Sequence, residues 1–388
     1  MKIIIAPDSF KESMSAELAA QSVIKGFQRV FPDAEYISLP VADGGEGTVD
    51  ALIAAQQGKK ISVTVADPLG FPVMAYYGLL AESKTAVIEM AQASGLMLVP
   101  MAQRNPMLTN SYGTGELITN ALAQGVERII LGIGGSATVD GGVGMLQALG
   151  VRFFDENHQL LGNTGNILSQ IAHIDIQQLD PRLAQCKIDI ACDVSNPLVG
   201  EYGSAAVFGP QKGATPDMVA ELDNGLNQLA ALLQQLTGTD YRHLAGGGAA
   251  GGIAVAAAAL LGGELKSGIE IVMDALAFDK HLQNADLVII GEGSMDGQTV
   301  GGKAPIGIAR LAAKHQVPVI ALSGVLGDGV EALHQEGVTA VFSILPRLSP
   351  LDEVLKQGAK NLENTACNVA RVLNMGRYLG NNSLSSLK

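Results

Sequence analysis

Short apolar runs alternate with amphipathic stretches at both ends of the chain. Five runs have the length and the flanking turn residues of strands: Ile3–Ala6, Tyr36–Val41, Leu287–Ile290, Val317–Leu322 and Val341–Leu345. Helical patterns lie between many of them, at Ala16–Val30, Thr48–Ala55 and Ile306–Lys314. Continuous apolar strands that alternate with helices are typical of a parallel sheet with helices on both faces. The pattern predicts a Rossmann-like or flavodoxin-like α/β domain built from both chain ends.

The middle of the chain has a different pattern. Three strand-like runs follow one another without helices and predict an antiparallel meander: Lys60–Ala66, Pro72–Leu80 and Thr85–Met90. Further on, helices are expected at Gly115–Gln124, Val143–Leu149, Met218–Leu236 and Gly251–Leu261, and strands at Ile129–Leu131 and Ile188–Ala191. A chain of 388 residues is too long for one ordinary core. We therefore expect two domains, residues 1–65 plus 266–388 and an inserted mixed α/β domain over 66–265.

The composition narrows the range of partners. The formal net charge of −13 disfavours nucleic acid and anionic membranes, and the absence of Trp argues against base stacking. The three cysteines, Cys186, Cys192 and Cys367, form no CxxC pair, and the apolar start of the chain is too short for a signal-peptide core. These features predict a cytoplasmic protein with reduced thiols. An acidic protein that binds an anion must do so through local donors, Lys, Arg or a metal.

The glycine-rich segment 132–142 is the most informative stretch of the chain. It joins the strand-like run Arg128–Leu131 to a helical run, so its N–H groups and the helix dipole suit a phosphate. Its polar residues Ser136, Thr138 and Asp140 could orient a hydroxyl or bind a metal. Residues 132–137 also read G-x-G-x-x-A, a dinucleotide fingerprint, with Asp155 further on. A nucleoside triphosphate site, a dinucleotide site and a merely tight turn therefore stay open on this segment alone.

Four predicted strands end beside an aspartate. These residues are Asp8 (with Ser9), Asp43 (with Glu46), Asp193 and Asp296. One aspartate at a strand end is most often a helix cap, and Asp8 or Ser9 could cap the helix expected near Ser15. Four together favour a ligand site, because ligands of open parallel sheets bind beyond the carboxyl ends of the strands.

Two lysines accompany these acids. Lys11 follows the first strand, where it could reach an anion or remain a solvated surface lysine. Residues 297–303 match the start of a P-loop, but Ala304 replaces the hydroxyl residue that would hold Mg²⁺, so the match is false; Lys303 could still contact phosphate as a point charge. The chain has no HExxH motif and no GxSxG elbow. Carboxylates, glycine loops and lysines are the set that phosphoryl transfer needs.

Five segments together resemble the bacterial class I glycerate kinases. They are IIIAPDSFKES at 3–13, PVADGGEGT at 40–48, GIGGSATVDGG at 132–142, ACDVSNPLVG at 191–200 and GEGSMDGQTVGGKAP at 291–305. They span nearly the whole chain in the family's order. The resemblance implies ATP-dependent phosphorylation of D-glycerate, most often at the 2-hydroxyl, and a two-domain α/β fold with the active site in the cleft between the domains.

We assign roles to the residues of these segments on chemical grounds. Gly134, Gly135 and Ser136 should present backbone donors to the ATP phosphates, with Asp140 and Lys303 as further nucleotide-binding residues. Asp193 is the first candidate for binding Mg²⁺ or accepting the substrate proton, and Asp43 and Asp296 compete with it. Lys11 and Lys303 would neutralise the glycerate carboxylate or the transferred phosphoryl group. The residues expected around the substrate are Asp8, Ser9, Asp43, Gly44, Gly45 and Glu46.

Two other functions and a second product compete with this interpretation. An NAD-dependent dehydrogenase would use Gly132, Gly134, Ala137 and Asp155, but no histidine accompanies the candidate motifs for hydride transfer. A carboxylate-binding sensor would place an anion among acidic residues that repel it. A kinase that forms 3-phosphoglycerate differs only by a small shift of the substrate.

Overall fold

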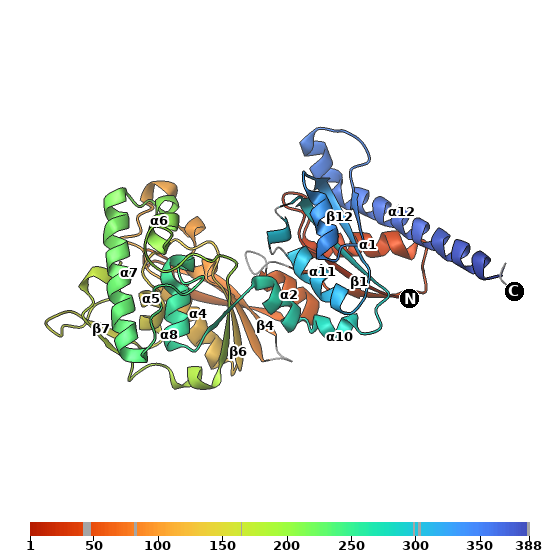
Figure 1. Cartoon of the computed structure of the whole chain (residues 1–388). Coiled ribbons are helices and arrows are strands. Elements are labelled where there is room, and N and C mark those ends of the chain that lie inside the picture. The colour runs from red at the N-terminus through yellow and green to blue at the C-terminus, as the bar shows by residue number, and fades with distance from the viewer. Residues whose placement is uncertain (42–47, 81–83, 164, 298, 302–303, 386–388) are drawn as a thin grey trace. The chain divides into compact units, whose positions relative to one another are not determined.

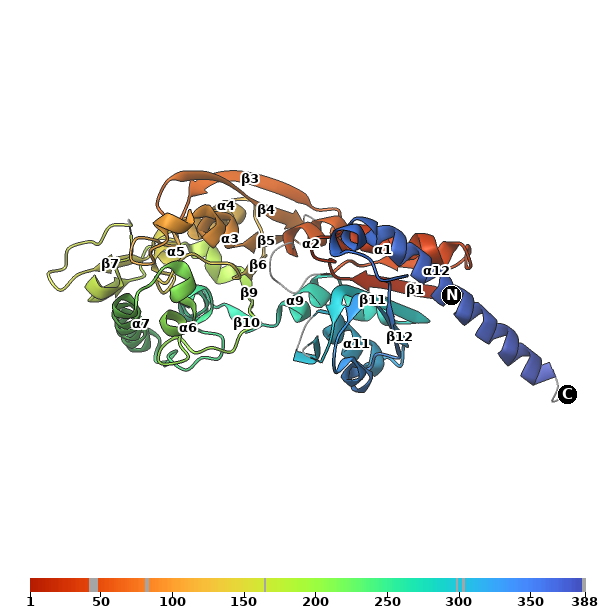
Figure 2. The ribbon, with the colours of Figure 1, turned by 90° about the horizontal axis from the view of Figure 1, so that it is seen from above.

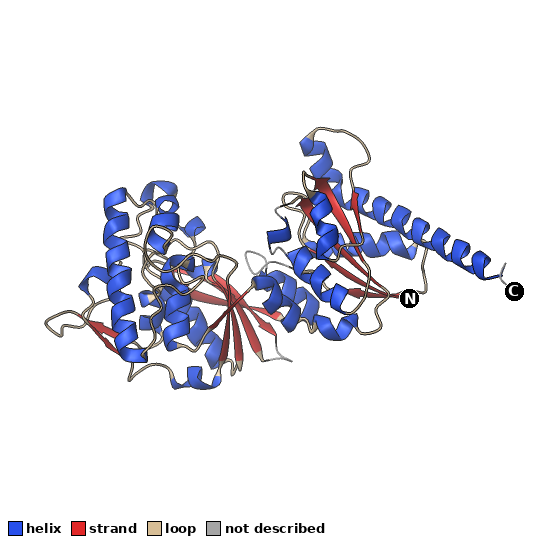
Figure 3. Ribbon diagram, in the orientation of Figure 1, coloured by secondary structure: helices blue, strands red, loops and turns tan. Residues whose placement is uncertain are grey.

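The chain folds into two compact units, each built from strands and helices (Figures 1 and 3). The computed structural model describes residues 1–41, 48–80, 84–163, 165–297, 299–301 and 304–385. The first unit comprises Met1–Asp43 and Val272–Lys388, and the second comprises Gly44–Ile271. One unit is therefore made from both chain ends, and the other is inserted between them.

The first unit contains a five-stranded, wholly parallel sheet. Its strands are β1 (Lys2–Pro7), β2 (Glu35–Ser38), β11 (Leu287–Met295), β12 (Val319–Leu326) and β13 (Ala340–Ser343). Their order across the sheet is β13-β12-β11-β1-β2. This is the flavodoxin-like order, in which the direction of winding reverses between β1 and β11. The predicted parallel α/β architecture is confirmed.

Helices cover both faces of this sheet. Ile3 and Ile5 of β1 belong to one buried cluster with residues of α1 (Ala16–Gln28) and α12 (Leu351–Ser385). The intervening Ile4 is fully buried outside that cluster, because successive side chains of a strand point to opposite faces. Figure 2 shows α1 beside α12 on one side of the strands and α11 (Ala304–Lys314) on the other. The short α10 (Phe278–Leu282) precedes β11.

The second unit contains a six-stranded mixed sheet of order β10-β9-β6-β5-β4-β3. The strands are β3 (Lys59–Ala66), β4 (Pro72–Leu80), β5 (Thr85–Glu89), β6 (Arg128–Gly132), β9 (Lys187–Ala191) and β10 (Glu264–Lys266). β3, β4 and β5 form the predicted antiparallel meander, whereas β5, β6, β9 and β10 are parallel. A separate hairpin, which the sequence pattern did not predict, consists of β7 (Arg152–Phe154) and β8 (His173–Asp175).

The boundaries between the two units lie at 43/44 and 271/272, whereas the sequence pattern predicted them at 65/66 and 265/266. β3 pairs with β4 along its whole length, from Lys59 opposite Leu79 to Ala66 opposite Pro72. The preceding helix α2 (Thr48–Gln56) packs on β4 and β5. Strand pairing and helix packing therefore place β3 and α2 in the inserted unit, and the predicted boundary at 65/66 separated most of β3 from the meander to which it belongs.

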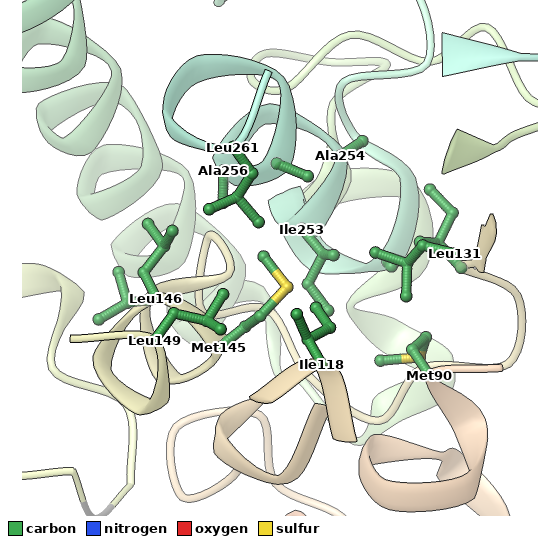
Figure 4. Close-up of a cluster of buried hydrophobic side chains, with 14 of the residues drawn as sticks. Met90, Ile118, Leu131, Met145, Leu146, Leu149, Ile253, Ala254, Ala256 and Leu261 are labelled. Carbon is green, nitrogen blue, oxygen red and sulfur yellow. The ribbon is translucent and has the colours of Figure 1, made fainter. Parts of the chain in front are cut away.

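A large apolar cluster stabilises the second unit. Its helices are α3 (Ala91–Ser94), α4 (Tyr112–Ala123), α5 (Val143–Ala148), α6 (Ser204–Phe208), α7 (Pro216–Thr237) and α8 (Ile253–Leu260). Figure 4 shows Ile118 of α4, Met145 of α5 and Ile253 of α8 in one buried cluster. This packing holds the helix that follows the glycine-rich segment. Within the described part of the chain, no helix is long and apolar enough to cross a bilayer.

Candidate active site

The carboxyl ends of three adjacent parallel strands of the second unit carry candidate residues. Gly132 at the end of β6 pairs with Glu89 of β5 on one side and with Ala191 of β9 on the other. The glycine-rich loop 132–142 leaves β6 at this edge, and Asp193 follows β9 two residues beyond Ala191. The register therefore brings Glu89, the loop and Asp193 to one edge of the sheet, where open α/β sheets bind ligands.

The outer part of the loop offers backbone donors. The residues on either side of Ser136 bind the backbone of residues 94–96: Leu96 N–H donates to Gly135 O at 2.8 Å, and Ala137 N–H donates to Ser94 O at 2.9 Å. Gly135 has a φ of +73°, which favours glycine. Among the described residues, the structure records no acceptor for the N–H groups of Gly134, Gly135 and Ser136, and both glycines are exposed. Three successive donors of this kind can bind an anion.

The inner part of the loop is held by Asp140. Its carboxylate is buried and accepts four hydrogen bonds, from Ser111 N at 2.8 Å, Ser111 Oγ at 2.7 Å, Gly142 N at 3.1 Å and Gly144 N at 3.2 Å. Ser111 Oγ also accepts from Met145 N at 3.0 Å. The first N–H groups of α5 are thus taken by the protein. The donors left for a phosphate belong to the loop before the helix, and Asp140 in this arrangement holds the turn.

A buried lysine, which the sequence analysis did not single out, lies behind the loop. Lys212 ends the short turn Pro210–Lys212 and is 2% exposed. Its Nζ donates to Ser136 Oγ at 2.6 Å and to Thr138 O at 2.7 Å. Burial lowers the pKa of Lys212 to about 7, against the charge of Asp140, which raises it. No motif surrounds this lysine, so only the fold brings it to the loop.

Asp193 has a structural partner at the edge of the sheet. Its Oδ1 accepts a hydrogen bond of 3.0 Å from the N–H of Gly268, the first residue of α9 (Gly268–Ala275). A carboxylate at a helix start also interacts favourably with the helix dipole. The capping alternative for Asp193 therefore has a definite geometry, and a ligand-binding role would have to coexist with it.

Glu89 is a second residue that the sequence analysis missed. It is 6% exposed, and its Oε1 accepts from Val49 N in the first turn of α2 at 3.1 Å. This bond holds the first turn of α2, which begins at Thr48, at the same edge of the sheet. The predicted residues Asp43, Gly44, Gly45 and Glu46 themselves lie outside the described residues. A lone acid at the end of the apolar run Thr85–Met90 is a signal that could have identified Glu89.

In the first unit, the candidate residues follow β1 at the point where the winding reverses. Asp8 N–H donates to Gly291 O of β11 at 2.8 Å, and Ser9 N–H donates to Asp8 Oδ1 at 2.5 Å. The N-cap of α1 is Ser15, whose Oγ accepts from Leu18 N at 3.2 Å. The idea that Asp8 or Ser9 caps this helix is therefore wrong. Lys11, two residues later, is exposed.

Strand β11 is longer than predicted. The sequence pattern ended it at Ile290, but it continues to Met295, which pairs with Leu326 of β12. Asp296 follows this extension and caps the turn Thr299–Gly301: its Oδ1 accepts from Thr299 N at 3.2 Å, and its N–H donates to Thr299 Oγ1 at 3.1 Å. Asp296 thus also has a capping contact. Lys303 lies outside the described residues.

Asp155 does not lie where a dinucleotide site would need its acidic residue. Asp155 Oδ1 accepts from the N–H groups of Asn157 and Gln159, at 2.8 Å each, within a turn after β7. β7 belongs to a separate hairpin and does not neighbour β6. A dinucleotide site needs its acid beyond a strand adjacent to the glycine-rich turn. Residues 132–137 therefore match the fingerprint by sequence alone.

Comparison with known proteins identifies the family of the chain. The sequence profile of the glycerate kinase family matches residues 3–374. The chain is 54% identical to the glycerate kinase of Haemophilus influenzae over 373 residues, which cover 96% of this chain and 99% of the relative. It is 51% identical to the glycerate 2-kinase of Escherichia coli, with 97% and 99% covered.

A solved structure has the same fold. The crystal structure of a protein assigned as glycerate kinase 2 of Salmonella typhimurium LT2 superposes with a TM-score of 0.90 at 50% sequence identity. The match covers 97% of this chain and 99% of that one. The predicted resemblance is confirmed, and neither the dehydrogenase nor the sensor alternative is supported. The chain belongs to the glycerate kinase family, a family of phosphotransferases that use ATP and act on an alcohol acceptor.

Proposed function

We propose that this chain transfers the γ-phosphoryl group of ATP to the 2-hydroxyl of D-glycerate and forms 2-phosphoglycerate and ADP. One observation carries the proposal: three successive N–H donors stand at the carboxyl edge of a sheet in a chain half identical to a glycerate 2-kinase. In the reaction the substrate oxygen forms a bond to the γ-phosphorus, the bond to the β-phosphate oxygen breaks, and the hydroxyl proton passes to a base. Such a reaction depends mainly on positioning and on charge neutralisation.

The glycine-rich loop is the proposed phosphate cradle. The N–H groups of Gly134, Gly135 and Ser136 would donate to phosphate oxygens, as backbone amides do in other anion sites. Exposure of the two glycines leaves room for a ligand that approaches the backbone closely. Asp140 supports this role from behind by holding the other end of the loop.

Mg²⁺ is the proposed metal. ATP sites usually hold it by one or two carboxylates together with phosphate oxygens, so a cluster of protein ligands is not required. The described residues contain no group of three His, Cys, Asp or Glu side chains suited to a metal. Asp193 supplies a carboxylate of the right chemistry beside the loop, and Asp43 is the second candidate. When bound, the ion would neutralise negative charge on the phosphates.

The first unit is proposed to hold the acid substrate. Lys11 would pair with the glycerate carboxylate or with the transferred phosphoryl group, since two anionic reactants must meet in an acidic protein. Asp8 and Ser9 would orient the hydroxyl groups. Asp193 or Asp296 would accept the hydroxyl proton. Gly44, Gly45, Glu46 and Lys303 remain predicted binding residues, and a cytoplasmic location, where ATP is available, remains predicted as well.

A product assay tests the function. The purified protein is incubated with D-glycerate, ATP and Mg²⁺, ADP release is coupled to NADH oxidation, and the product is identified by phosphorus NMR. We expect glycerate-dependent ADP release and a signal of 2-phosphoglycerate. A 3-phosphoglycerate signal would correct the regiochemistry alone. ADP release that equals the glycerate-free background would overturn the proposal.

A further inference from the structure

Lys212 stands directly behind the donors of the glycine-rich loop. Its Nζ contacts Ser136 Oγ on one side of Ala137 and Thr138 O on the other, at 2.6 and 2.7 Å. Gly134 and Gly135, which directly precede Ser136, are exposed. The two contacts therefore fix the chain directly beside the segment 134–136, for whose N–H groups the described residues supply no recorded acceptor.

The number of hydrogen bonds recorded for the Lys212 amine fits its neutral form. A neutral lysine amine has two N–H groups, and both have an acceptor here, whereas an ammonium ion has three. An ammonium ion without full solvation or pairing is costly in a buried site. The same burial lowers the pKa of Lys212 to about 7. An anion placed near the loop would change this balance in favour of the ammonium form.

Among the residues that the structure describes, the charge that acts on Lys212 is that of Asp140 in the loop. The Asp140 carboxylate is already shared among four donors. Helix α6, which packs against the turn of Lys212, consists of Ser204–Phe208 and carries no charge. The backbone beside Lys212 is also closely packed, because a Cβ on the next residue, Gly213, would lie 2.1 Å from the carbonyl oxygen of Arg104. A phosphate at the loop would thus add negative charge where the protein supplies little.

We propose that Lys212 is a positioning residue for the nucleotide phosphates: it holds Ser136 and Thr138 so that the loop donors face outward, and it takes up a proton when a phosphate anion binds to them. This inference rests on the proposed function of the loop. It predicts that the affinity for ATP falls as the pH rises through neutrality, because binding then requires a proton from a more alkaline solution.

Calorimetry of the wild type tests the proton uptake without any substitution. ATP with Mg²⁺ is titrated at about pH 8 in two buffers of different ionisation enthalpy, since Lys212 is then largely neutral before binding. We expect the uptake of a large fraction of one proton. Lys212→Met should abolish the uptake, and Lys59→Met, a change at an exposed lysine of the same unit, should preserve it. Binding without any uptake in the wild type would overturn the proton coupling.

Kinetics test the positioning. Loss of hydrogen bonds to a charged group predicts that Lys212→Met raises the KM for ATP about tenfold or more, while the KM for glycerate stays within about twofold. Ser136→Ala should raise the KM for ATP with little change in Tm, because Lys212 keeps Thr138 O. The double variant should be no worse than Lys212→Met alone if the lysine acts through Ser136.

The outcomes separate the two proposals. If the wild type neither binds ATP nor phosphorylates glycerate, the proposed function fails. If it does both, yet Lys212→Met and Ser136→Ala lower only Tm and leave the KM for ATP unchanged, Lys212 is merely structural and this inference fails. Should Lys212→Met not fold, Ser136→Ala and the wild-type proton uptake still decide.

Discussion

The carboxylate of Asp140 accepts hydrogen bonds from both the backbone N–H and the hydroxyl of Ser111, at 2.8 and 2.7 Å. Ser111 stands at the start of α4, and Asp140 precedes the start of α5. One buried carboxylate therefore ties the beginnings of two core helices together. Because these helices pack in the apolar core (Figure 4), the inner end of the glycine-rich loop is fixed to this core.

Replacement of Asp140 should cost stability. Asp140→Asn would remove the charge and turn one acceptor into a donor that faces other donors. We expect the free energy of unfolding, measured by urea denaturation, to fall by about 3 kcal/mol. Asp155→Asn is the matched control: its turn needs only the retained carbonyl oxygen, so the change should stay below about 1 kcal/mol. Full stability with a lost affinity for ATP would instead make Asp140 a nucleotide ligand.

Asp193→Asn should separate capping from catalysis. The amide oxygen of Asn can still accept from Gly268 N, so the Tm should change little. If Asp193 binds the metal or accepts the substrate proton, kcat should fall by about a hundredfold or more. Asp193→Ala, which removes the cap as well, should lower both. A variant Asp193→Asn with the full kcat would leave Asp193 only its capping role.

Lys11→Met should impair the kinetics with glycerate and leave the stability of the fold unchanged. The side chain of Lys11 is exposed, so the free energy of unfolding should change by less than about 0.5 kcal/mol. Loss of the positive charge should raise the KM for glycerate or lower kcat by about tenfold, as measured in the coupled assay. Lys25→Met, at another exposed lysine of the same unit, is the control that should change neither. Unchanged kinetics would return Lys11 to the solvated surface.

Lys212 should make the stability of the unliganded protein depend on pH. Its folded pKa is about 7 against an ordinary value of 10.5. Below pH 7 the lysine is protonated in both states, and the full cost of the buried charge is present. Between these values the folded state has released the proton while the unfolded state retains it, so stability rises with pH.

The comparison with Lys212→Met isolates this effect. Between about pH 7 and pH 9, the wild type should gain about 2 kcal/mol in free energy of unfolding relative to the variant. Urea denaturation of both proteins over this range measures it. Parallel pH profiles would contradict the titration of Lys212 in this range.

Local patterns were sufficient for much of the architecture. The apolar strand β1 and the helix α1 follow from short-range periodicity and from turn residues, and so does the meander of β3, β4 and β5. The segment 132–142 was identified as a strand-to-helix loop for the same reason. Together with the four other segments that resemble glycerate kinases, it also identified the family, because residue types and their order can be compared without knowledge of the fold.

Long-range pairing explains what local patterns could not predict. The predicted boundary at 65/66 left most of β3 in the first unit, although the same pattern had predicted the meander. Pairing of β3 with β4 along its whole length assigns the strand to the inserted unit. The extension of β11 to Met295 depends on β12, which supplies the partner backbone. From the sequence pattern alone, glycine and serine after Ile290 predict a loop, whereas Gly291 and Ser294 belong to the strand.

The sequence by itself determined the fold class and the family and singled out the glycine-rich loop as the candidate nucleotide site, because these depend on residue types and on spacing along the chain. Only the tertiary structure showed which contacts the individual residues of the loop make. Asp140 is held by Ser111, and Ser136 is held by Lys212, which lies 76 positions away. Hydrogen bonds and burial act through space, so no spacing in the chain could distinguish the residue that holds the turn from the residues proposed to face a ligand.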